Sequence, residues 1–396
     1  MAVSNGASAS AAPSADATPP PGGAGAAGPS PYHESSQFRH WRYSRGRLAA
    51  LRAELNEKSK EVTARNMAAE KEAQLSLGHS FTDPPPAATY PTVDEELNLV
   101  WFYCNQASQI CRHGFGLSEE VETTAISYMK RFYLKNSVME WHPKSIMPTC
   151  VFLAAKTCNH PVPIDVLVSK LKGFKPADVL DLEFLVAQSL SFEFWVRGAD
   201  KALRGWSLEL QDQAKPPVDA IQRALPAALD RLRWSRYTDA EFIYTPSQVA
   251  LACFRLANAE LVDSFLEFRY AAASATEGAG LPYGLPLDDL LRLTKEIEGV
   301  IRDAGQGEFD MKTIKEIDKR LKSCTNPEKI PGTALYIKRK AEADAKAVEA
   351  KAEKAAKVAA AREADELTFG GALGAGAKAA VPDDPFAPPP PPPKAE

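Results

Sequence analysis

The chain has 396 residues, of which 45% are hydrophobic and 25% are charged, and its formal net charge is −4. This length suits two ordinary domains with tails. The charge balance gives no sign of a nucleic-acid or membrane surface, and no apolar run reaches the ~18 residues that a spanning helix needs. The six cysteines are scattered, so we expect reduced thiols in a cytosolic or nuclear protein.

The N-terminal part divides into two segments. Residues 1–31 hold one charged side chain, Asp16, among Ala, Ser, Gly and Pro. Such a segment cannot bury a core, so we expect a disordered extension, and it lacks the basic and apolar regions of a secretory signal. Residues 32–93 are expected to hold a helix capped by Ser44 and then a proline-rich linker at 78–92, because proline breaks helices.

Residues 94–197 carry helical signals throughout and are expected to form a first bundle of five helices. The expected helices are about 94–113, 118–133, 143–157, 163–172 and 175–190. The third and the fifth are apolar on nearly every side, so we expect both to lie deep in the bundle. Pro148 lies inside the third helix, where it removes a hydrogen bond and should kink the helix or delay its start.

Residues 198–305 are expected to form a second five-helix bundle, and an internal repeat relates it to the first. At an offset of 103 residues, Pro143 matches Pro246 and Cys150 matches Cys253. In both copies the proline takes the favoured first helical position behind a polar residue. The expected helices are about 199–213, 217–242, 245–260, 262–271 and 286–304, with a loop insertion at 271–286. No period-2 segment is convincing, so the predicted fold is all-α, with two tandem bundles and flanking helices.

The C-terminal part is expected to contain helices and a tail. Within residues 306–366 we expect a short helix at 311–322 and a solvated helix at 337–366, the latter rich in Ala, Lys and Glu with charge pairs four residues apart. Residues 367–396 include the run Pro388–Pro393 and are expected to form a disordered polyproline II tail.

Signs of catalysis are missing from the sequence. It holds no glycine-rich phosphate loop, and no Ser/His/Asp spacing is credible. The nearest approach to a metal cluster is Cys104, Cys111 and His113, which lack the paired close spacing of zinc ligands. We therefore expect no enzyme activity of the chain itself, no cofactor and no metal.

Two charged residues stand on helices that are otherwise apolar, Lys156 and Glu183. Burying either charge without a partner would be costly. One interpretation is purely structural: the two form an intramolecular ion pair, or the lysine extends to the surface. The other is that they lie at the rim of a partner-binding face, where charges fix the orientation of an apolar contact.

Three segments of the sequence resemble the cyclin family: Tyr32–Trp41 (YHESSQFRHW), Lys130–Pro143 (KRFYLKNSVMEWHP) and Tyr244–Leu251 (YTPSQVAL). The resemblance covers roughly residues 32–322 and implies two cyclin-box bundles. In this family a lysine near the end of the third helix and a glutamate in the fifth bind the kinase's mobile helix and the start of its activation segment.

By position these family residues correspond to Lys156 and Glu183, with neighbouring kinase contacts at Leu153 and Phe192. The resemblance points to the cyclin branch of the CDK-activating kinase. It implies a regulatory subunit in the nucleus whose partners are a cyclin-dependent kinase catalytic subunit, a RING-type assembly factor and the transcription factor IIH core. The expected substrates of that kinase are CDK activation segments and the RNA polymerase II C-terminal repeats.

Two alternatives remain open at this point. Tandem cyclin boxes also occur in general transcription factors that contact promoter DNA. Residues 94–190 hold 9 Lys and Arg against 11 Asp and Glu, and residues 191–305 hold 13 against 17. Because DNA binding favours a clear basic excess, we expect no direct nucleic-acid contact. The second alternative is a scaffold that keeps the helical platform without activating a kinase.

Overall fold

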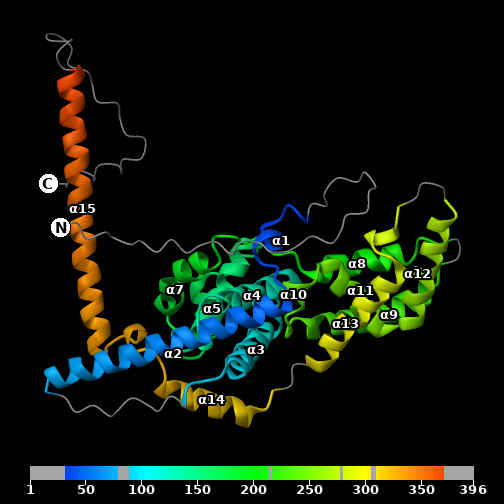
Figure 1. Ribbon diagram of the computed structural model, residues 1–396, viewed down its shortest axis with the longest axis horizontal. Coiled ribbons are helices and arrows are strands. Elements are labelled where there is room, and N and C mark those ends of the chain that lie inside the picture. Colours follow the sequence, from blue (N-terminus) through cyan, green and yellow to red (C-terminus); the bar gives the residue numbers. More distant parts are fainter. Residues whose placement is uncertain (1–31, 79–88, 214–215, 277–279, 305–308, 370–396) are drawn as a thin grey trace, which may run out of the picture. The chain divides into compact units, whose positions relative to one another are not determined.

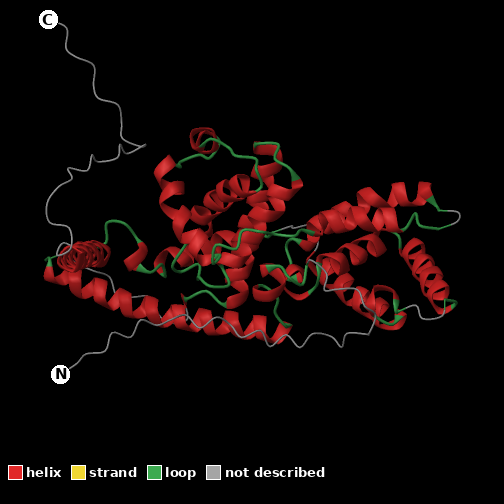
Figure 2. Cartoon of the chain, turned by 90° about the horizontal axis from the view of Figure 1, so that it is seen from above, coloured by secondary structure: helices red, strands yellow, loops and turns green. Residues whose placement is uncertain are grey.

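The computed structural model describes residues 32–78, 89–213, 216–276, 280–304 and 309–369 (Figure 1). The extension expected at 1–31 and nearly all of the tail expected at 367–396 lie outside the described residues. The described chain consists of helices joined by loops, and no strand occurs in it (Figure 2). The predicted all-α class is therefore confirmed.

Two helices precede the first bundle, α1 (Ser36–His40) and α2 (Arg45–Ser76). The Ser44 hydroxyl accepts a hydrogen bond from the Arg47 amide at 3.2 Å, so the predicted cap opens α2. The guanidinium of Arg52 on α2 donates two hydrogen bonds to the Asp239 carboxylate, at 2.6 and 2.7 Å. These contacts join the N-terminal helix to a residue nearly 190 positions away in sequence.

The first bundle is built around α5. Its elements are α3 (Val93–Gln109), the π-helical turn η2 (Ile110–Gly114), α4 (Glu119–Phe132), α5 (Pro143–Thr157), α6 (Ile164–Ser169) and α7 (Pro176–Ser189). Helix α5 packs against α3, α4 and α7, and its Ile146 and Cys150 side chains are inaccessible to solvent. The expectation that 143–157 lies deep is confirmed.

Pro148 does not delay the start of α5, so of the two effects expected of it, a kink or a delayed start, the second is absent. The helix begins at Pro143 and continues through Pro148. The His142 ring accepts a hydrogen bond from the Lys144 amide at 3.0 Å, which caps the first turn before Pro148 is reached. The carbonyl that Pro148 cannot bond belongs to Lys144, an exposed residue, so water can satisfy it.

Helix α7 lies less deep than its sequence indicates. Val179, Val186 and Leu190 are buried against the rest of the bundle, whereas Leu180 is 43% and Phe184 69% exposed. The expectation of full burial is wrong because α5 takes only one face of α7, and the described helices leave the opposite apolar face uncovered.

The second bundle repeats this plan around α11. Its elements are α8 (Ala199–Glu209), α9 (Val218–Ser235), α10 (Ala240–Ile243), α11 (Pro246–Ala257), α12 (Ala259–Ser274), the short turn η3 (Pro282–Gly284) and α13 (Leu287–Ala304). Cys253 on α11 is fully buried, as is its repeat partner Cys150. The two bundles have separate hydrophobic cores, which confirms the tandem arrangement.

The helix expected over 217–242 is interrupted. Helix α9 ends at Ser235, and a turn precedes the short α10. The Thr238 carbonyl accepts a hydrogen bond from Lys130 Nζ of the first bundle at 2.6 Å, and the Thr238 hydroxyl accepts one from the Ala240 amide at 3.1 Å. The tertiary contact from Lys130 and the local turn bond of Thr238 together outweigh the helical preference of the segment.

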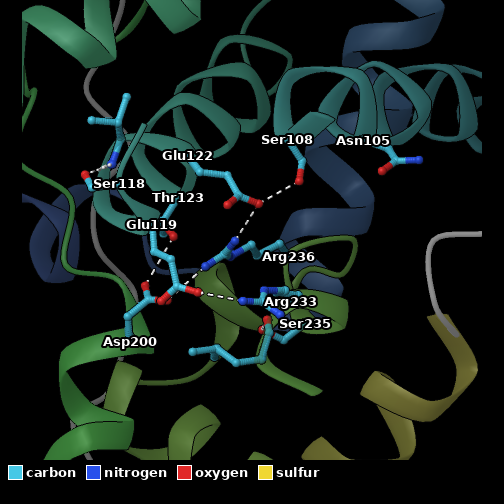
Figure 3. A network of polar contacts seen from close by, with 12 residues as sticks. Asn105, Ser108, Ser118, Glu119, Glu122, Thr123, Asp200, Arg233, Ser235 and Arg236 are labelled. Atoms are coloured by element: carbon cyan, nitrogen blue, oxygen red, sulfur yellow. Dashed lines mark hydrogen bonds and ion pairs between the residues drawn. The ribbon is translucent and has the colours of Figure 1, made fainter. Parts of the chain in front are cut away.

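A buried charge network joins the two bundles (Figure 3). Arg236, just after α9, lies with its Nη1 2.7 Å from Glu122 Oε1 of α4, and its Nη2 donates to Asp200 Oδ1 at 2.8 Å. The Ser108 hydroxyl donates to Glu122 at 2.6 Å. Arg233 makes a further ion pair with α4. The two bundles are thus connected by charge-assisted hydrogen bonds as well as by the chain.

Helix α14 (Met311–Ser323) returns to the first bundle, and its Ile314, Ile317 and Leu321 join that bundle's core. The short turn η4 (Pro327–Lys329) follows, and α15 (Ala334–Phe369) forms a unit of its own. Side chains at 337–361 are exposed along α15. The helices expected at 311–322 and 337–366 are therefore both present, and the second is solvated as expected.

Candidate functional site

Lys156 and Glu183 meet on the surface of the first bundle. Lys156 lies in the last turn of α5, where a cation is favoured by the helix dipole, and Glu183 lies on the adjacent α7 (Figure 1). The Lys156 ammonium donates to a carboxylate oxygen of Glu183. Their side chains are 45% and 23% exposed, so this is a half-open ion pair at the surface. The lysine also lies 5.1 Å from the centre of the Phe152 ring.

Exposed apolar side chains lie on α7, the helix that carries Glu183, and just after its end. Leu180 and Phe184 lie one helical turn apart on the open face of α7, and Phe192 follows the end of that helix. The Phe184 and Phe192 ring centres are 6.1 Å apart, and Phe192 is 56% exposed. We call Leu180, Phe184 and Phe192 the apolar patch. Contiguous exposed apolar groups of this kind mark interaction surfaces in soluble proteins.

Leu153 occupies a different position from the other three residues that the sequence pointed to. It is 5% exposed and belongs to the core of the first bundle, one turn before Lys156 on α5. Lys156 and Glu183 thus meet at the surface and Phe192 is exposed, whereas Leu153 is buried in the core of the bundle. A partner would meet mainly the charged pair and the aromatic rings.

The segment 191–197, which we call the linker, connects the two bundles and carries one edge of this surface. Ser191 and Phe192 both have positive φ, at 55° and 58°, a conformation that side chains other than glycine rarely adopt. The linker also presents Trp195, which is 54% exposed and has Arg197 stacked on its ring at 4.3 Å. The backbone therefore directs two large aromatic groups outward from one short segment.

A cavity of about 610 Å³ lies at the junction of the bundles, and Trp195 is one of the residues that line it. Its walls include Tyr32 and His33 from the N-terminal segment and Lys201 from α8. Trp195 is thus a residue of the linker that also lines this cavity.

The sequence interpretation missed Leu180, Phe184 and Trp195. A signal for the first two was present, because α7 is apolar around most of its circumference. That pattern is compatible with deep burial and with an exposed docking face, and periodicity does not separate the two. Trp195 lies outside any helix, where no periodic pattern could identify it.

Side chains that could bind a metal ion are not clustered in the part of the chain that the structure describes. Among the described residues, no set of three or more His, Cys, Asp or Glu side chains is arranged to bind an ion. Cys104 and Cys111 are fully buried, and burial raises the pKa of each thiol to about 12, which disfavours the thiolate that a metal would need. Nor does any described helix have the length and apolar character needed to span a membrane.

The fold and this surface define a class of protein: a tandem helical-bundle platform with an exposed apolar face. The sequence matches the family described as the cyclin N-terminal domain over residues 109–194, and the cyclin C-terminal domain over residues 199–326. The first range runs from the end of α3 to just past α7, and the second runs from the start of α8 to just past α14.

Individual relatives agree with this match. The chain is 32% identical to Cyclin CCL1 of Saccharomyces cerevisiae over 248 residues, which is 62% of this chain and 63% of that protein. It is 30% identical to Cyclin-H1-1 of Arabidopsis thaliana over 243 residues, 59% of this chain and 68% of that protein. The match thus spans a little under two thirds of the yeast cyclin and slightly more than two thirds of the plant cyclin.

Solved structures also resemble it. A chain of the CAK complex of Chaetomium thermophilum bound to ATP-γ-S is 26% identical, with a TM-score of 0.64, covering 79% of this chain and 94% of that one. A chain of the yeast TFIIK (Kin28/Ccl1/Tfb3) complex is 28% identical, with a TM-score of 0.52, covering 68% and 100%. The chain belongs to the cyclin family, in its cyclin H group.

Proposed function

We propose that the chain binds a cyclin-dependent kinase catalytic subunit through the Lys156–Glu183 pair and the apolar patch, and thereby activates it. The observation that carries this proposal is the exposure of Leu180, Phe184 and Phe192 around a half-open ion pair. The relatives named as cyclins, and the kinase complexes in which two similar chains were solved, support the choice of a kinase as partner.

The two kinds of group serve different purposes in such an interface. Burying a large apolar side chain is favourable by about 1.5–3 kcal/mol, so Phe184 and Phe192 are suited to supply affinity. The charged pair suits orientation, because a partner must meet a cation and an anion in fixed positions. Since Lys156 already pairs with Glu183, neither charge is left without a partner before binding.

Activation needs no chemistry from this chain. In the proposed mechanism the cyclin binds the active arrangement of the kinase more tightly than the inactive one and so shifts the kinase population toward it. The kinase's mobile helix is then held inward, with its Lys–Glu pair and its metal-binding loop aligned. The cyclin is thus a regulatory subunit, and the kinase supplies all the catalytic groups.

We further propose the assembly to which this pair belongs. A CDK-activating kinase with a RING-type assembly factor, attached to the transcription factor IIH core in the nucleus, agrees with the similarity to the CAK and TFIIK chains. Its substrates would be CDK activation segments and the RNA polymerase II C-terminal repeats. The DNA-contacting alternative is disfavoured by the acidic excess of both bundles.

The test is co-purification with the cognate catalytic subunit, followed by a kinase assay on a C-terminal-repeat peptide. Lys156→Ala combined with Glu183→Ala removes the pair without leaving an isolated charge, and we expect it to reduce both binding and activation. Arg269→Ala with Glu209→Ala is the matched control, since that pair also joins two helices and its side chains are 34% and 33% exposed.

Three results distinguish the alternatives. Loss of binding in the Lys156/Glu183 variant but not in the control supports the proposed surface. Binding by the wild type without activation would make the chain a scaffold. No binding by the wild type would overturn the proposal and favour the DNA-contacting alternative.

A further inference from the structure

The linker that carries Phe192 and Trp195 is held in place by residues outside the apolar patch. Its first two residues adopt a backbone conformation that is costly for non-glycine residues and persists only where surrounding contacts enforce it. Both Phe192 and Trp195 are more than half exposed, so their own side chains contribute little to that enforcement. The groups that fix the linker must therefore bind its other residues.

Glu193 is the main anchor. One of its carboxylate oxygens accepts a hydrogen bond from Trp41 Nε1 at 2.6 Å, and the other pairs with the His40 ring. The Glu193 carbonyl accepts a hydrogen bond from Arg131 Nη1 at 3.3 Å. Three groups thus hold the residue that immediately follows Phe192, and two of them come from the N-terminal segment.

The far end of the linker is held by the same segment. Gln37 on α1 accepts a hydrogen bond from the Arg197 amide at 2.7 Å and donates one to the Arg197 carbonyl at 3.3 Å. Tyr128 donates to the Phe194 carbonyl at 2.6 Å between these two anchors. The anchored residues, Glu193, Phe194 and Arg197, lie between and after the two exposed aromatic residues. The backbone is thus fixed while the side chains of Phe192 and Trp195 remain exposed to a partner.

The N-terminal anchor is itself firmly seated. Trp41 is 2% exposed, and two cations lie near its ring centre: Arg131 of α4 at 5.0 Å and Lys135, just after α4, at 4.7 Å. Lys135 also donates to the Ser191 hydroxyl at 2.8 Å, at the start of the strained pair. Trp41 therefore connects the N-terminal segment, the first bundle and the linker at one point.

We propose that Gln37, His40 and Trp41 are positioning residues that hold the linker, through Glu193 and Arg197, in the shape that presents Phe192 to the kinase. This inference rests on the proposed function, because it assumes that Phe192 contacts the kinase. It adds that the N-terminal segment sets kinase affinity without touching the kinase itself.

The experiment is a double-mutant cycle on the affinity of the purified chain for the kinase catalytic subunit. Trp41→Phe keeps an aromatic ring near the two cations, removes the N–H that binds Glu193 and leaves a smaller side chain at this buried site. We expect it to weaken binding roughly three- to tenfold, the range of modest coupling between connected residues. With Phe192→Ala already present, Trp41→Phe should weaken binding no further, because the residue it positions is gone.

Hydrogen exchange supplies a readout that a general loss of stability would not produce. In Trp41→Phe, amides of the linker should exchange faster while those of α5 stay protected. Arg52→Met is the matched control: it removes two hydrogen bonds between the N-terminal region and Asp239, but none to the linker. It should leave kinase affinity unchanged. If Trp41→Phe does not fold, Gln37→Ala replaces it in the same cycle, with the same expectations.

The outcomes separate this inference from the proposed function. If Phe192→Ala and Phe184→Ala both leave affinity unchanged, the kinase surface itself is wrong. If Phe192→Ala weakens binding but Trp41→Phe does not, or if their effects add fully, the surface stands and the positioning role fails. Full coupling together with faster linker exchange supports the positioning role.

Discussion

Arg236 of the second bundle and Glu122 of the first form a buried ion pair, with Nη1 and Oε1 2.7 Å apart and side chains only 7% and 2% exposed. A second carboxylate, that of Asp200, lies against the same guanidinium. Charges so removed from water interact strongly with each other and have few other partners. Arg236 is therefore a buried contact between the two cyclin-fold bundles, beside the Arg233–Glu119 and Lys130–Thr238 contacts that also join them.

Replacing this arginine should destabilise the protein strongly. Arg236→Met leaves the buried Glu122 and the partly buried Asp200 carboxylates without their cation, and breaking a buried pair in this way costs about 3–5 kcal/mol. Urea unfolding followed by circular dichroism measures the loss. Adding Glu122→Gln to Arg236→Met should recover part of it, because one of the unpaired charges is then removed. A loss below about 1 kcal/mol in the single variant would show that the network is dispensable.

A buried carboxyl makes stability depend on pH near neutrality. Desolvation raises the pKa of Glu96 to about 7, against hydrogen bonds from Ser137 and Asn56 that lower it. Between its unfolded pKa near 4.5 and its folded pKa near 7, the folded state binds more protons than the unfolded state. The contribution of Glu96 to stability therefore falls as pH rises through this window.

Glu96→Gln isolates this contribution, since the amide resembles the protonated acid in shape and in its acceptor oxygen. We expect the variant to match the wild type near pH 4, below the unfolded pKa, and to exceed it above pH 7 by at most about 3 kcal/mol. The comparison at each pH is needed because desolvation lowers the pKa of His142, which acts in the opposite sense. A constant difference across pH would contradict the prediction.

The cap of α11, the central helix of the second bundle, can be tested by measuring the free energy of unfolding in urea. The Thr245 hydroxyl accepts from the Gln248 amide at 3.3 Å, and the Gln248 side chain accepts from the Thr245 amide at 2.9 Å. Thr245→Ala breaks this reciprocal box and should cost about 1 kcal/mol of unfolding free energy. Ser247→Ala, at an exposed position two residues on, is the control and should be nearly neutral.

The all-α class and the tandem bundles were predictable because their signals are local and repeated. The pairs Pro143/Pro246 and Cys150/Cys253 mark the start and the buried face of the two central helices, and both helices form as expected. Lys156 and Glu183 could be selected because a charge on an apolar helix is conspicuous. Their pairing across two helices agrees with the structural interpretation and is also compatible with the functional one.

What could not be predicted depends on contacts between distant segments. The end of α9 at Ser235 reflects the binding of Thr238 by Lys130 of the other bundle, which local propensity does not encode. The exposure of one face of α7 could not be predicted either. The sequence shows that this face is apolar, but not whether another helix covers it. The anchoring of Glu193 by Trp41 joins residues 152 positions apart.

The open face of α7 gives the most direct test of the proposed surface. Phe184 is 69% exposed, so Phe184→Ala removes little buried area within the chain and should change the unfolding free energy by less than about 0.5 kcal/mol. If a kinase covers this ring, the same change should weaken binding by roughly 2 kcal/mol, about thirtyfold. Isothermal titration calorimetry with the purified catalytic subunit measures the difference.

Leu208→Ala is the matched control for this change. Leu208 is a large apolar residue of the second bundle that is also 69% exposed, and it lies on α8, outside the apolar patch. It should leave both stability and kinase affinity unchanged. Equal weakening by the two variants would mean that exposed apolar groups contribute without regard to position, and the assignment of the kinase contact to α7 would then fail. Weakening by Phe184→Ala alone is the result expected if affinity comes from aromatic groups around the Lys156–Glu183 pair.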